Sequence, residues 1–390
     1  MRPITKLLNR YIWISALFCL IIHFTFELQR LKNFFDSQRV LLYTLLMILS
    51  YIITYYKVIP SLIKVNLRAG IYGHDIYLKG TPEFEVKIAE CLGIGTGVVY
   101  FASLIFIYGF YRAQHMIDHF NLISSVLGYI GFGTFLGFVD DVLELRWRDK
   151  LVYPFIFSIL IIFNYEGDTK LHFPLFIESF IGIENIDLSY LFYIYMILLS
   201  IFCTNSINIY AGISGLEVGQ SLIIGLGLMI ENLLCVVLND DAKNNAYSLI
   251  ILGPFVAVST ALLRWNRVQA KTFVGDTYCY FAGCVLAASG IISKSPVKLL
   301  LFFIPQLFNF LLSLPQLFGF VFCPRHRLPT MDVSTKKLQS TFPQNLNLVN
   351  FALWITGPLN EETLGDILLF LQVICNLGVI STLRLIKFKT

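Results

Sequence analysis

Charged residues are scarce in this chain of 390 residues, because Asp, Glu, Lys and Arg together make up only 14% of it. A soluble globular domain carries roughly 25% charged residues, so the composition excludes an ordinary water-soluble protein. Hydrophobic residues reach 56% and aromatic residues 15%, a balance typical of chains that face lipid and the membrane interface. The sequence therefore predicts an all-α polytopic membrane protein in a lipid bilayer.

Paired cysteines, a strong net charge and internal repeats are also missing. The net charge is only +4, which gives no indication of a nucleic-acid partner. The cysteines form no CxxC spacing and most lie in apolar runs, which favours small buried hydrophobic residues over disulfides or a zinc site. They are Cys19, Cys91, Cys203, Cys235, Cys279, Cys284, Cys323 and Cys375.

Long apolar runs recur along the chain, near the length of about 20 residues that crosses a bilayer. A run at 11–28 predicts an extra N-terminal helix, since no small-residue cleavage site follows it. We divide the chain into an N-terminal extension, 1–39, and a single transmembrane domain, 40–390, in which 322–365 is a loop insertion. The domain is predicted to be a bundle of about ten transmembrane helices, at 40–59, 91–111, 122–139, 151–164, 190–207, 219–238, 248–264, 277–292, 299–321 and 366–383.

The order of these spans predicts which loops share a face. One face receives the loops 60–90, 140–150, 208–218, 265–276 and 322–365. With their borders, these loops carry about twice as many lysines and arginines as the opposite face, which predicts that they are cytoplasmic. Every unusual polar motif lies in or beside one of them. The sequence therefore predicts one shared site on cytoplasmic loops.

The first motif is the charged stretch FVDDVLELRWRDK, which directly follows an apolar run. Asp140 and Asp141 are adjacent at a membrane boundary, where ionisable groups are costly and usually functional. A divalent cation such as Mg²⁺, or a basic partner, would relieve their repulsion. A solvated helix end with basic interfacial anchors is the alternative, which explains the basic residues but not the acidic pair.

Two glycine-bearing segments follow. In CTNSINIYAGISGLEVGQS, Asn205 and Asn208 share one helix face, and Gly212 opens a run of glycines that permits close approach to a ligand. In FVGDTYCYFAG, Asp276 begins an apolar helix, and Phe273 offers a stacking face or a packing residue. Hydrogen bonds between helices explain the asparagines equally well, and a helix cap alone explains Asp276.

The third kind of motif is basic. CPRHRLP places Arg325, His326 and Arg327 just outside a span, between two prolines. Guanidinium groups bind phosphate oxygens bidentately, so a pyrophosphate suits this segment, and positive-inside anchoring is the alternative. IAECLGI adds Glu90 beside the first loop, a weak signal by itself.

Taken in order, these segments resemble the polyprenyl-phosphate N-acetylhexosamine-1-phosphate transferases, and specifically their eukaryotic branch. The resemblance covers about residues 40–390 and is strongest over 136–330. It implies a multi-pass enzyme of the endoplasmic reticulum membrane, a homodimer, with its active site facing the cytoplasm. Such enzymes transfer GlcNAc-1-phosphate from UDP-GlcNAc to dolichyl phosphate, release UMP and begin the lipid-linked oligosaccharide for protein N-glycosylation. The family uses Mg²⁺ and is inhibited by tunicamycin.

The resemblance also implies roles for the chemistry-bearing residues. Asp140 and Asp141 match the family's paired acids, the first acting on the proton of the lipid phosphate, and Lys150 matches a lysine at the phosphates. Asn208 and Asp276 match the Mg²⁺ ligands. The substrate-binding matches are Phe273 against uracil, the glycine loop opposite it with Asn205, Gly212 and Ser214, Glu90 at the nucleotide, and Arg325, His326 and Arg327 at the pyrophosphate and N-acetyl sugar.

Two departures from the family pattern change the chemistry of the site. Glu144 stands where relatives more often have Asn, which adds negative charge near the acidic pair. Ser214 stands where relatives have Asn, which puts one hydrogen bond to uridine in doubt. Two alternatives stay open, namely a related enzyme using another UDP-sugar or polyprenyl phosphate and, more remotely, a secondary transporter.

Overall fold

The computed structural model describes residues 37–385 except 79–80, 114–119, 147–148, 166, 239 and 325–326. The helix expected at 11–28, and the residues Arg325 and His326, lie outside the described residues. In the described part, helices account for most of the chain, and three short two-stranded hairpins connect them.

The main helices follow the apolar runs. In chain order they are α2 (Ser37–Ile53), α3 (Ile59–Ala69), α4 (Gly93–Ala113), α5 (Phe120–Leu143), α6 (Asp149–Ile162), α7 (Leu175–Ile181), α8 (Tyr190–Ile209), α9 (Leu216–Val237), α10 (Ala242–Asn266), α11 (Gly275–Ile292), α12 (Pro296–Phe302), α13 (Ile304–Leu317), α14 (Leu348–Thr356) and α15 (Glu361–Leu385).

Short elements fill the loops. The antiparallel hairpins are β1 (Tyr72–Gly73) with β2 (Ile88–Ala89), β3 (Lys170–His172) with β4 (Asn185–Asp187), and β5 (Thr330–Asp332) with β6 (Lys337–Gln339). Single turns are the π-helix η1 (Thr54–Val58) and the 3-10 helices η2 (Ile76–Leu78) and η3 (Pro82–Glu85).

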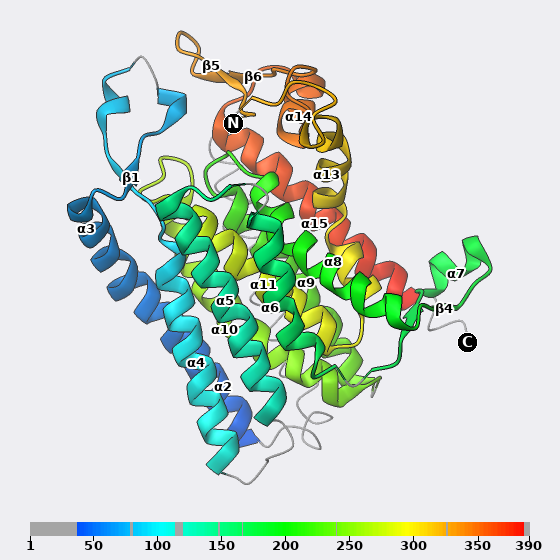
Figure 1. The fold of residues 1–390 in the computed structure, drawn as a ribbon. Coiled ribbons are helices and arrows are strands. Elements are labelled where there is room, and N and C mark those ends of the chain that lie inside the picture. Colours follow the sequence, from blue (N-terminus) through cyan, green and yellow to red (C-terminus); the bar gives the residue numbers. More distant parts are fainter. Residues whose placement is uncertain are drawn as a thin grey trace.

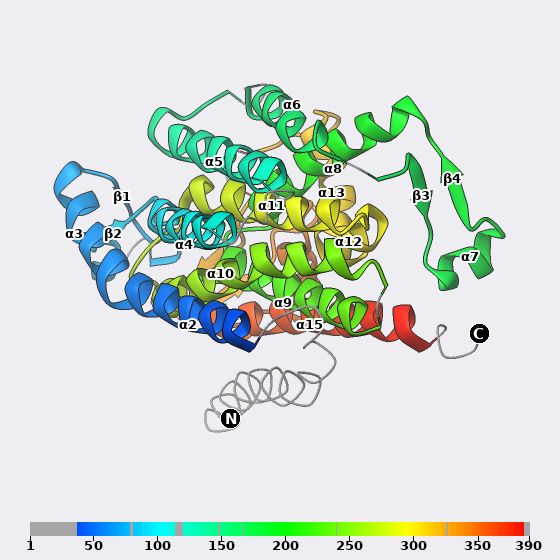
Figure 2. The same ribbon diagram turned by 90° about the horizontal axis from the view of Figure 1, so that it is seen from below.

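Helix α11 forms the centre of the bundle, between α5 and α10 (Figure 2). Every α11 residue from Thr277 to Ile292 is buried. Helix α8 approaches its backbone closely, because Gly283 has no side chain and the Cβ of any other residue there would collide with the backbone of Cys203 and Thr204. A helix that is surrounded on all sides has apolar residues on every face and is not amphipathic.

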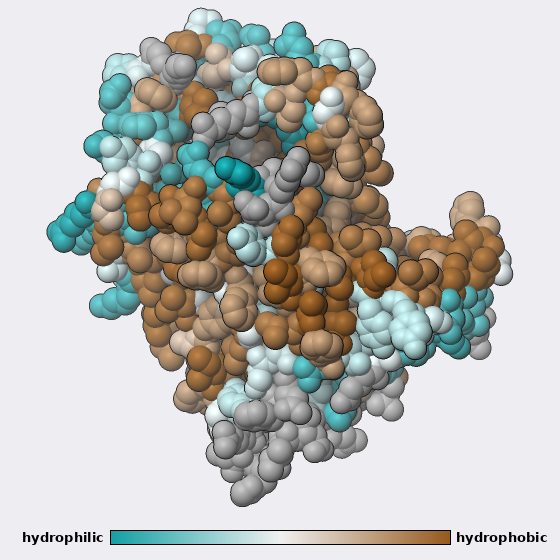
Figure 3. Space-filling model, viewed as in Figure 1, coloured by the Kyte–Doolittle hydropathy of each residue, from teal (hydrophilic) through white to brown (hydrophobic). Residues whose placement is uncertain are grey.

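The outer surface fits a bilayer. Large apolar side chains are exposed on α4, α5 and α6, for example Ile105, Phe135 and Ile156, and they colour this face brown in Figure 3. Seven described helices are long and apolar enough to cross a membrane, or eight if the pair α12 and α13, bent by 76°, forms one span. The expectation of a multi-pass helical membrane protein is confirmed, whereas the count of about ten spans stays a prediction.

Several predicted helix ends were wrong. The helix expected to end at residue 59 continues through η1 and α3 to Ala69, because α3 is amphipathic and fell outside a search for purely apolar runs. The span expected at 299–321 is two helices that meet at Phe303. The span expected at 122–139 runs on to Leu143, so Asp140 and Asp141 lie in its last turns and not in a loop.

Candidate active site

Five loops meet at one end of the bundle, where Figure 1 places β1, β5 and β6. Ala89 pairs in parallel with Thr272, which joins the first loop to the start of α11. The Tyr77 hydroxyl donates to the Gly212 carbonyl, and the Ser214 amide donates to Glu361. Contacts from Asp141, in the last turn of α5, to the first turn of α11 join the segment 140–150 to this group. The loops that the sequence assigned to one face therefore do lie together.

Asp140 and Lys150 form the charged centre of this end. Lys150 Nζ lies 2.6 Å from Asp140 Oδ2 and 3.2 Å from Asp276 Oδ2. The Asp140 side chain is only 2% exposed, and its other oxygen accepts a hydrogen bond from the Leu145 amide at 3.0 Å. One ammonium group thus bridges carboxylates from α5 and α11, and the Asp276 side chain is 26% exposed.

Asp141 points to different partners from its neighbour. It accepts hydrogen bonds from the backbone amides of Asp276 and Thr277, at 2.6 and 3.0 Å, and from the Thr277 hydroxyl at 2.5 Å. Asp141 therefore satisfies free amides in the first turn of α11 and places a negative charge at the positive end of that helix. The repulsion between the two aspartates is relieved by giving each its own set of donors.

The alternative that Asp276 merely caps the start of α11 is excluded by these contacts. The residue that precedes α11 is Val274, and no side chain on the helix's own chain segment caps it. Asp276 is the second residue of the helix, and its carboxylate pairs with Lys150 instead of the backbone. Asp276 is not a helix cap, because the capping function belongs to Asp141 of another helix.

Glu90 and Phe273 reach the site through backbone pairing. The Phe273 amide donates to the Ala89 carbonyl at 2.8 Å, and the Leu92 amide donates to the Phe273 carbonyl at 3.3 Å. Both side chains border Gly73, since a Cβ there would lie 3.0 Å from Glu90 Oε1 and 3.4 Å from Phe273 Cδ2. Burial, and then the nearby charges of Asp141 and Asp276, raise the pKa of Glu90.

Asn208 lies at the same end as Asp276. The two helices that carry them run in opposite directions and touch where Thr204 meets Gly283. Asn208 is one turn from that contact and Asp276 two turns, both toward the loops, or roughly 6 and 10 Å along the helix axes. Asn205, by contrast, donates to the Ile201 carbonyl of its own helix at 2.9 Å.

The donor chemistry at this end fits Mg²⁺ in part. Among the described residues, no three His, Cys, Asp or Glu side chains are close enough to hold a metal ion by themselves. No hydrogen bond joins the Asn208 side chain to any described residue, and Asp276 is open on one side. Mg²⁺ is commonly bound by one or two protein oxygens together with substrate phosphates. Asp276 and Asn208 provide that number of protein oxygens.

The glycine loop between α8 and α9 has three side-chain hydrogen-bonding partners, two of which lie outside the sequence motifs. Gly212, with a φ of 100°, accepts from Tyr77 at 2.6 Å, and its amide donates to Glu217 at 3.2 Å. The Ser214 amide donates to Glu361 Oε1 at 2.8 Å. Glu217 directly follows the glycines in sequence and was detectable. Tyr77 and Glu361 lie far away in the chain, and no local pattern marks them.

Of the three basic residues in CPRHRLP, only Arg327 is among the described residues. Its backbone carbonyl accepts hydrogen bonds from the side chains of Asn347 and Asn350, at 2.6 and 3.1 Å. Burial lowers the pKa of the Arg327 guanidinium, and no ion pair joins it to a carboxylate in the described part of the chain. Leu328, the next residue, packs against Gly212, which brings this segment to the glycine loop.

Comparison with known proteins agrees with this site. Residues 123–294 match glycosyl transferase family 4. A UDP-N-acetylglucosamine–dolichyl-phosphate N-acetylglucosaminephosphotransferase of Dictyostelium discoideum is 39% identical over 345 residues, which is 82% of this chain and 83% of that protein. This chain belongs to the family of UDP-N-acetylglucosamine–dolichyl-phosphate N-acetylglucosaminephosphotransferases. The matched segment contains Asp140, Lys150, Asn208 and Asp276, so the family's defining region and the charged centre of the structure coincide.

Two fungal members with the same name are also similar. The Schizosaccharomyces pombe protein is 31% identical over 388 residues, covering 82% of this chain and 85% of its own length. The Saccharomyces cerevisiae protein is 35% identical over 321 residues, covering 74% and 70%. Membership therefore rests on most of the chain and not on the motifs alone. Glu144 is exposed directly after the end of α5 and follows Asp140 by one helical turn.

Proposed function

We propose that this protein transfers GlcNAc-1-phosphate from UDP-GlcNAc to dolichyl phosphate, forming GlcNAc-diphosphodolichol and UMP. The relatives that are named as UDP-N-acetylglucosamine–dolichyl-phosphate N-acetylglucosaminephosphotransferases match most of the chain. The observation that carries the proposal is the Lys150 ammonium, which bridges Asp140 and Asp276 where the loops converge. An enzyme that joins two phosphate-bearing substrates needs cations held in place, and it needs them at the end of the bundle where lipid meets water.

The reaction is a direct displacement in this proposal. An oxygen of dolichyl phosphate attacks the phosphorus that carries GlcNAc, and UMP leaves with the electrons of the broken pyrophosphate bond. Asp140 takes the proton of the lipid phosphate or orients its oxygen. Lys150, already beside Asp140, neutralises charge on the approaching phosphates. Asp141 acts through α11, whose first turn it holds beside the reacting groups.

The proposed reaction also uses Mg²⁺. Asp276 and Asn208 would hold it, and it would offset the charge of the pyrophosphate. Because Lys150 contacts Asp276 in the structure, the ammonium and the metal would share one carboxylate. The carboxylates of Asp140 and Asp141 add negative potential that attracts a cation to this end.

Substrate recognition is assigned to the surrounding loops. Phe273 provides a face for uracil, with the glycine loop opposite it and Glu90 at the nucleotide. Arg327, together with Arg325 and His326, would bind the pyrophosphate and the N-acetyl sugar. The basic loops are proposed to face the cytoplasm of an endoplasmic reticulum membrane. A homodimer and inhibition by tunicamycin are further parts of the proposal.

The deciding experiment measures transfer of radiolabelled GlcNAc-1-phosphate to dolichyl phosphate by purified protein in detergent with Mg²⁺. We expect a labelled lipid that disappears with EDTA and in Asp276→Ala. Labelled lipid that persists in Asp276→Ala would remove Asp276 from the metal site. Transfer from another UDP-sugar but not from UDP-GlcNAc would favour a related phosphotransferase, and no product with any UDP-sugar from folded protein would favour a transporter.

A further inference from the structure

The backbone of the glycine loop is held by three side chains, and two of them, Tyr77 and Glu361, lie outside the sequence motifs. Three hydrogen bonds reach its backbone from three separate segments, namely Tyr77 in η2, Glu217 in α9 and Glu361 at the start of α15. We infer that Tyr77 and Glu361 are positioning residues that hold Gly212–Ser214 in the conformation that receives the nucleotide. This inference rests on the proposed function, because it takes the loop as part of the UDP-GlcNAc site.

The loop needs external partners because of its own geometry. Gly212 has a φ of 100°, and both its amide and its carbonyl point to side chains instead of to a regular helix or strand. Tyr77 is only 7% exposed, and its ring is packed in a hydrophobic cluster that includes Tyr210 and Leu338, which restricts the position of its hydroxyl. A buried donor and a fixed acceptor define the direction of the Gly212 peptide.

Glu361 works as an acceptor for backbone and not as an ion-pair partner. In the described residues no Lys or Arg pairs with Glu361, and its carboxylate accepts a hydrogen bond from the Ser214 amide at 2.8 Å. Hydrogen bonds from backbone amides to a carboxylate are stronger than those between neutral groups. Glu361 also ties the loop to the end of the 322–365 insertion, whose Leu328 packs against Gly212. Glu361 and Leu328 therefore connect the glycine loop to the segment that carries Arg327.

The test compares steady-state kinetics of four variants with the parent protein. Tyr77→Phe removes one oxygen, and we expect the KM for UDP-GlcNAc to rise about threefold to tenfold, the effect of one lost hydrogen bond. Glu361→Leu leaves the Ser214 amide unpaired, and the same KM should rise by more than about tenfold. Glu361→Gln keeps an acceptor oxygen and should stay within about twofold of the parent. In all of them the KM for dolichyl phosphate should not change.

Tyr129→Phe is the matched control. Tyr129 is fully buried in α5, and its hydroxyl bonds to Ser200 of α8, away from the loop. Its loss should lower the melting temperature without changing the KM for UDP-GlcNAc. Equal nucleotide KM values in Tyr77→Phe and the parent would overturn the inference, as would equal KM increases for both substrates. The proposed function fails separately, if the parent protein itself transfers no GlcNAc-1-phosphate; in that case binding of UMP to the same variants decides whether the loop is a nucleotide site.

Discussion

A lysine pairs with a buried acid near each end of the bundle, but the two pairs differ in their charge balance. Lys298 Nζ of α12 lies 3.6 Å from Glu231 Oε1 of α9, and Glu231 is roughly 22 Å along the helix from the loop end. At the loop end, Lys150 is shared by Asp140 and Asp276, and the charges of Asp141 and Glu90 lie close by. In the described residues Lys298 forms an ion pair with one carboxylate, whereas Lys150 is shared by two.

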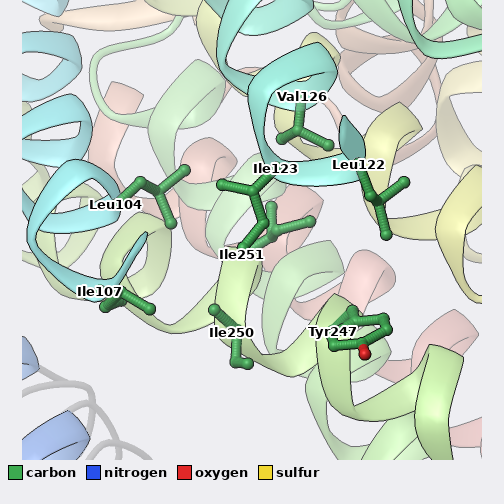
Figure 4. Close-up of a pocket in the computed structure, with 8 residues that line it drawn as sticks. All are labelled: Leu104, Ile107, Leu122, Ile123, Val126, Tyr247, Ile250 and Ile251. Carbon is green, nitrogen blue, oxygen red and sulfur yellow. The ribbon is translucent and has the colours of Figure 1, made fainter. Parts of the chain in front are cut away.

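An apolar pocket lies between α4, α5 and α10. It is lined by apolar side chains of α4, α5 and α10, such as Leu104, Ile123 and Ile251, with the Tyr247 ring at its edge (Figure 4). Among the described residues, no Asp, Glu, Lys or Arg lines this pocket. What distinguishes the loop end is a group of carboxylates around one shared ammonium. Such a group is costly without a further cation, which is the reason to expect a metal there.

The largest effect is expected from Lys150→Met. The change leaves the buried Asp140 carboxylate without its counter-charge, which costs about 3 kcal/mol of unfolding free energy, and it removes a cation from the phosphates. Transfer should fall at least about a hundredfold, as for loss of other charge-stabilising groups. Thermal unfolding and the transfer assay measure both effects. Adding Asp140→Asn should recover stability but not activity; recovery of neither would mean that the ion pair is not what Lys150 provides.

Asp141→Asn should distinguish the role of Asp141 from that of Asp140. Asp141 accepts three hydrogen bonds at the start of α11, and an uncharged amide serves this position less well. We expect a loss of about 1–2 kcal/mol in unfolding free energy, the usual worth of a helix cap. Asp140→Asn is the matched variant, and it should lose activity with a smaller loss of stability. If both variants show the same ratio of lost activity to lost stability, the division of roles is wrong.

Lys298→Met tests the ion pair between Lys298 and Glu231. The same substitution as in Lys150→Met should lower the unfolding free energy by about 1 kcal/mol, because the pair is long at 3.6 Å and Lys298 is partly exposed. The Mg²⁺ concentration that gives half-maximal transfer should equal that of the parent protein. A shift in that concentration would show that the two ends are coupled.

The smallest effect is expected from Glu90→Gln, measured as melting temperature against pH in EDTA. Burial, Asp141 and Asp276 raise the pKa of Glu90, so ionising Glu90 costs folding free energy as the pH rises above its unfolded value of about 4.3. At pH 7.5 the variant should melt about 1–2 °C above the parent, and the difference should vanish near pH 4. A variant that is less stable than the parent at pH 7.5 would show that the Glu90 carboxylate has a stabilising partner.

Much of the architecture could be predicted from the sequence. Apolar runs of the right length located the membrane helices, because the bilayer allows few other structures. Their order placed the five polar loops on one face, and the structure brings those loops together. Helix ends were less predictable, as at α3 and at the break between α12 and α13, because amphipathic continuation and a sharp bend are decided by packing against neighbours and not by local hydrophobicity.

The sequence by itself determined that this is a membrane-embedded member of its family, and which acids, amides and basic residues its loops contain. Only the tertiary structure decided that Asp140 pairs with Lys150 while Asp141 caps α11, since neighbouring side chains on a helix point about 100° apart toward different partners. The same holds for Tyr77 and Glu361. Their contacts with the glycine loop span 135 and 147 residues, and hydrogen bonds of that range leave no periodic signal in a single chain.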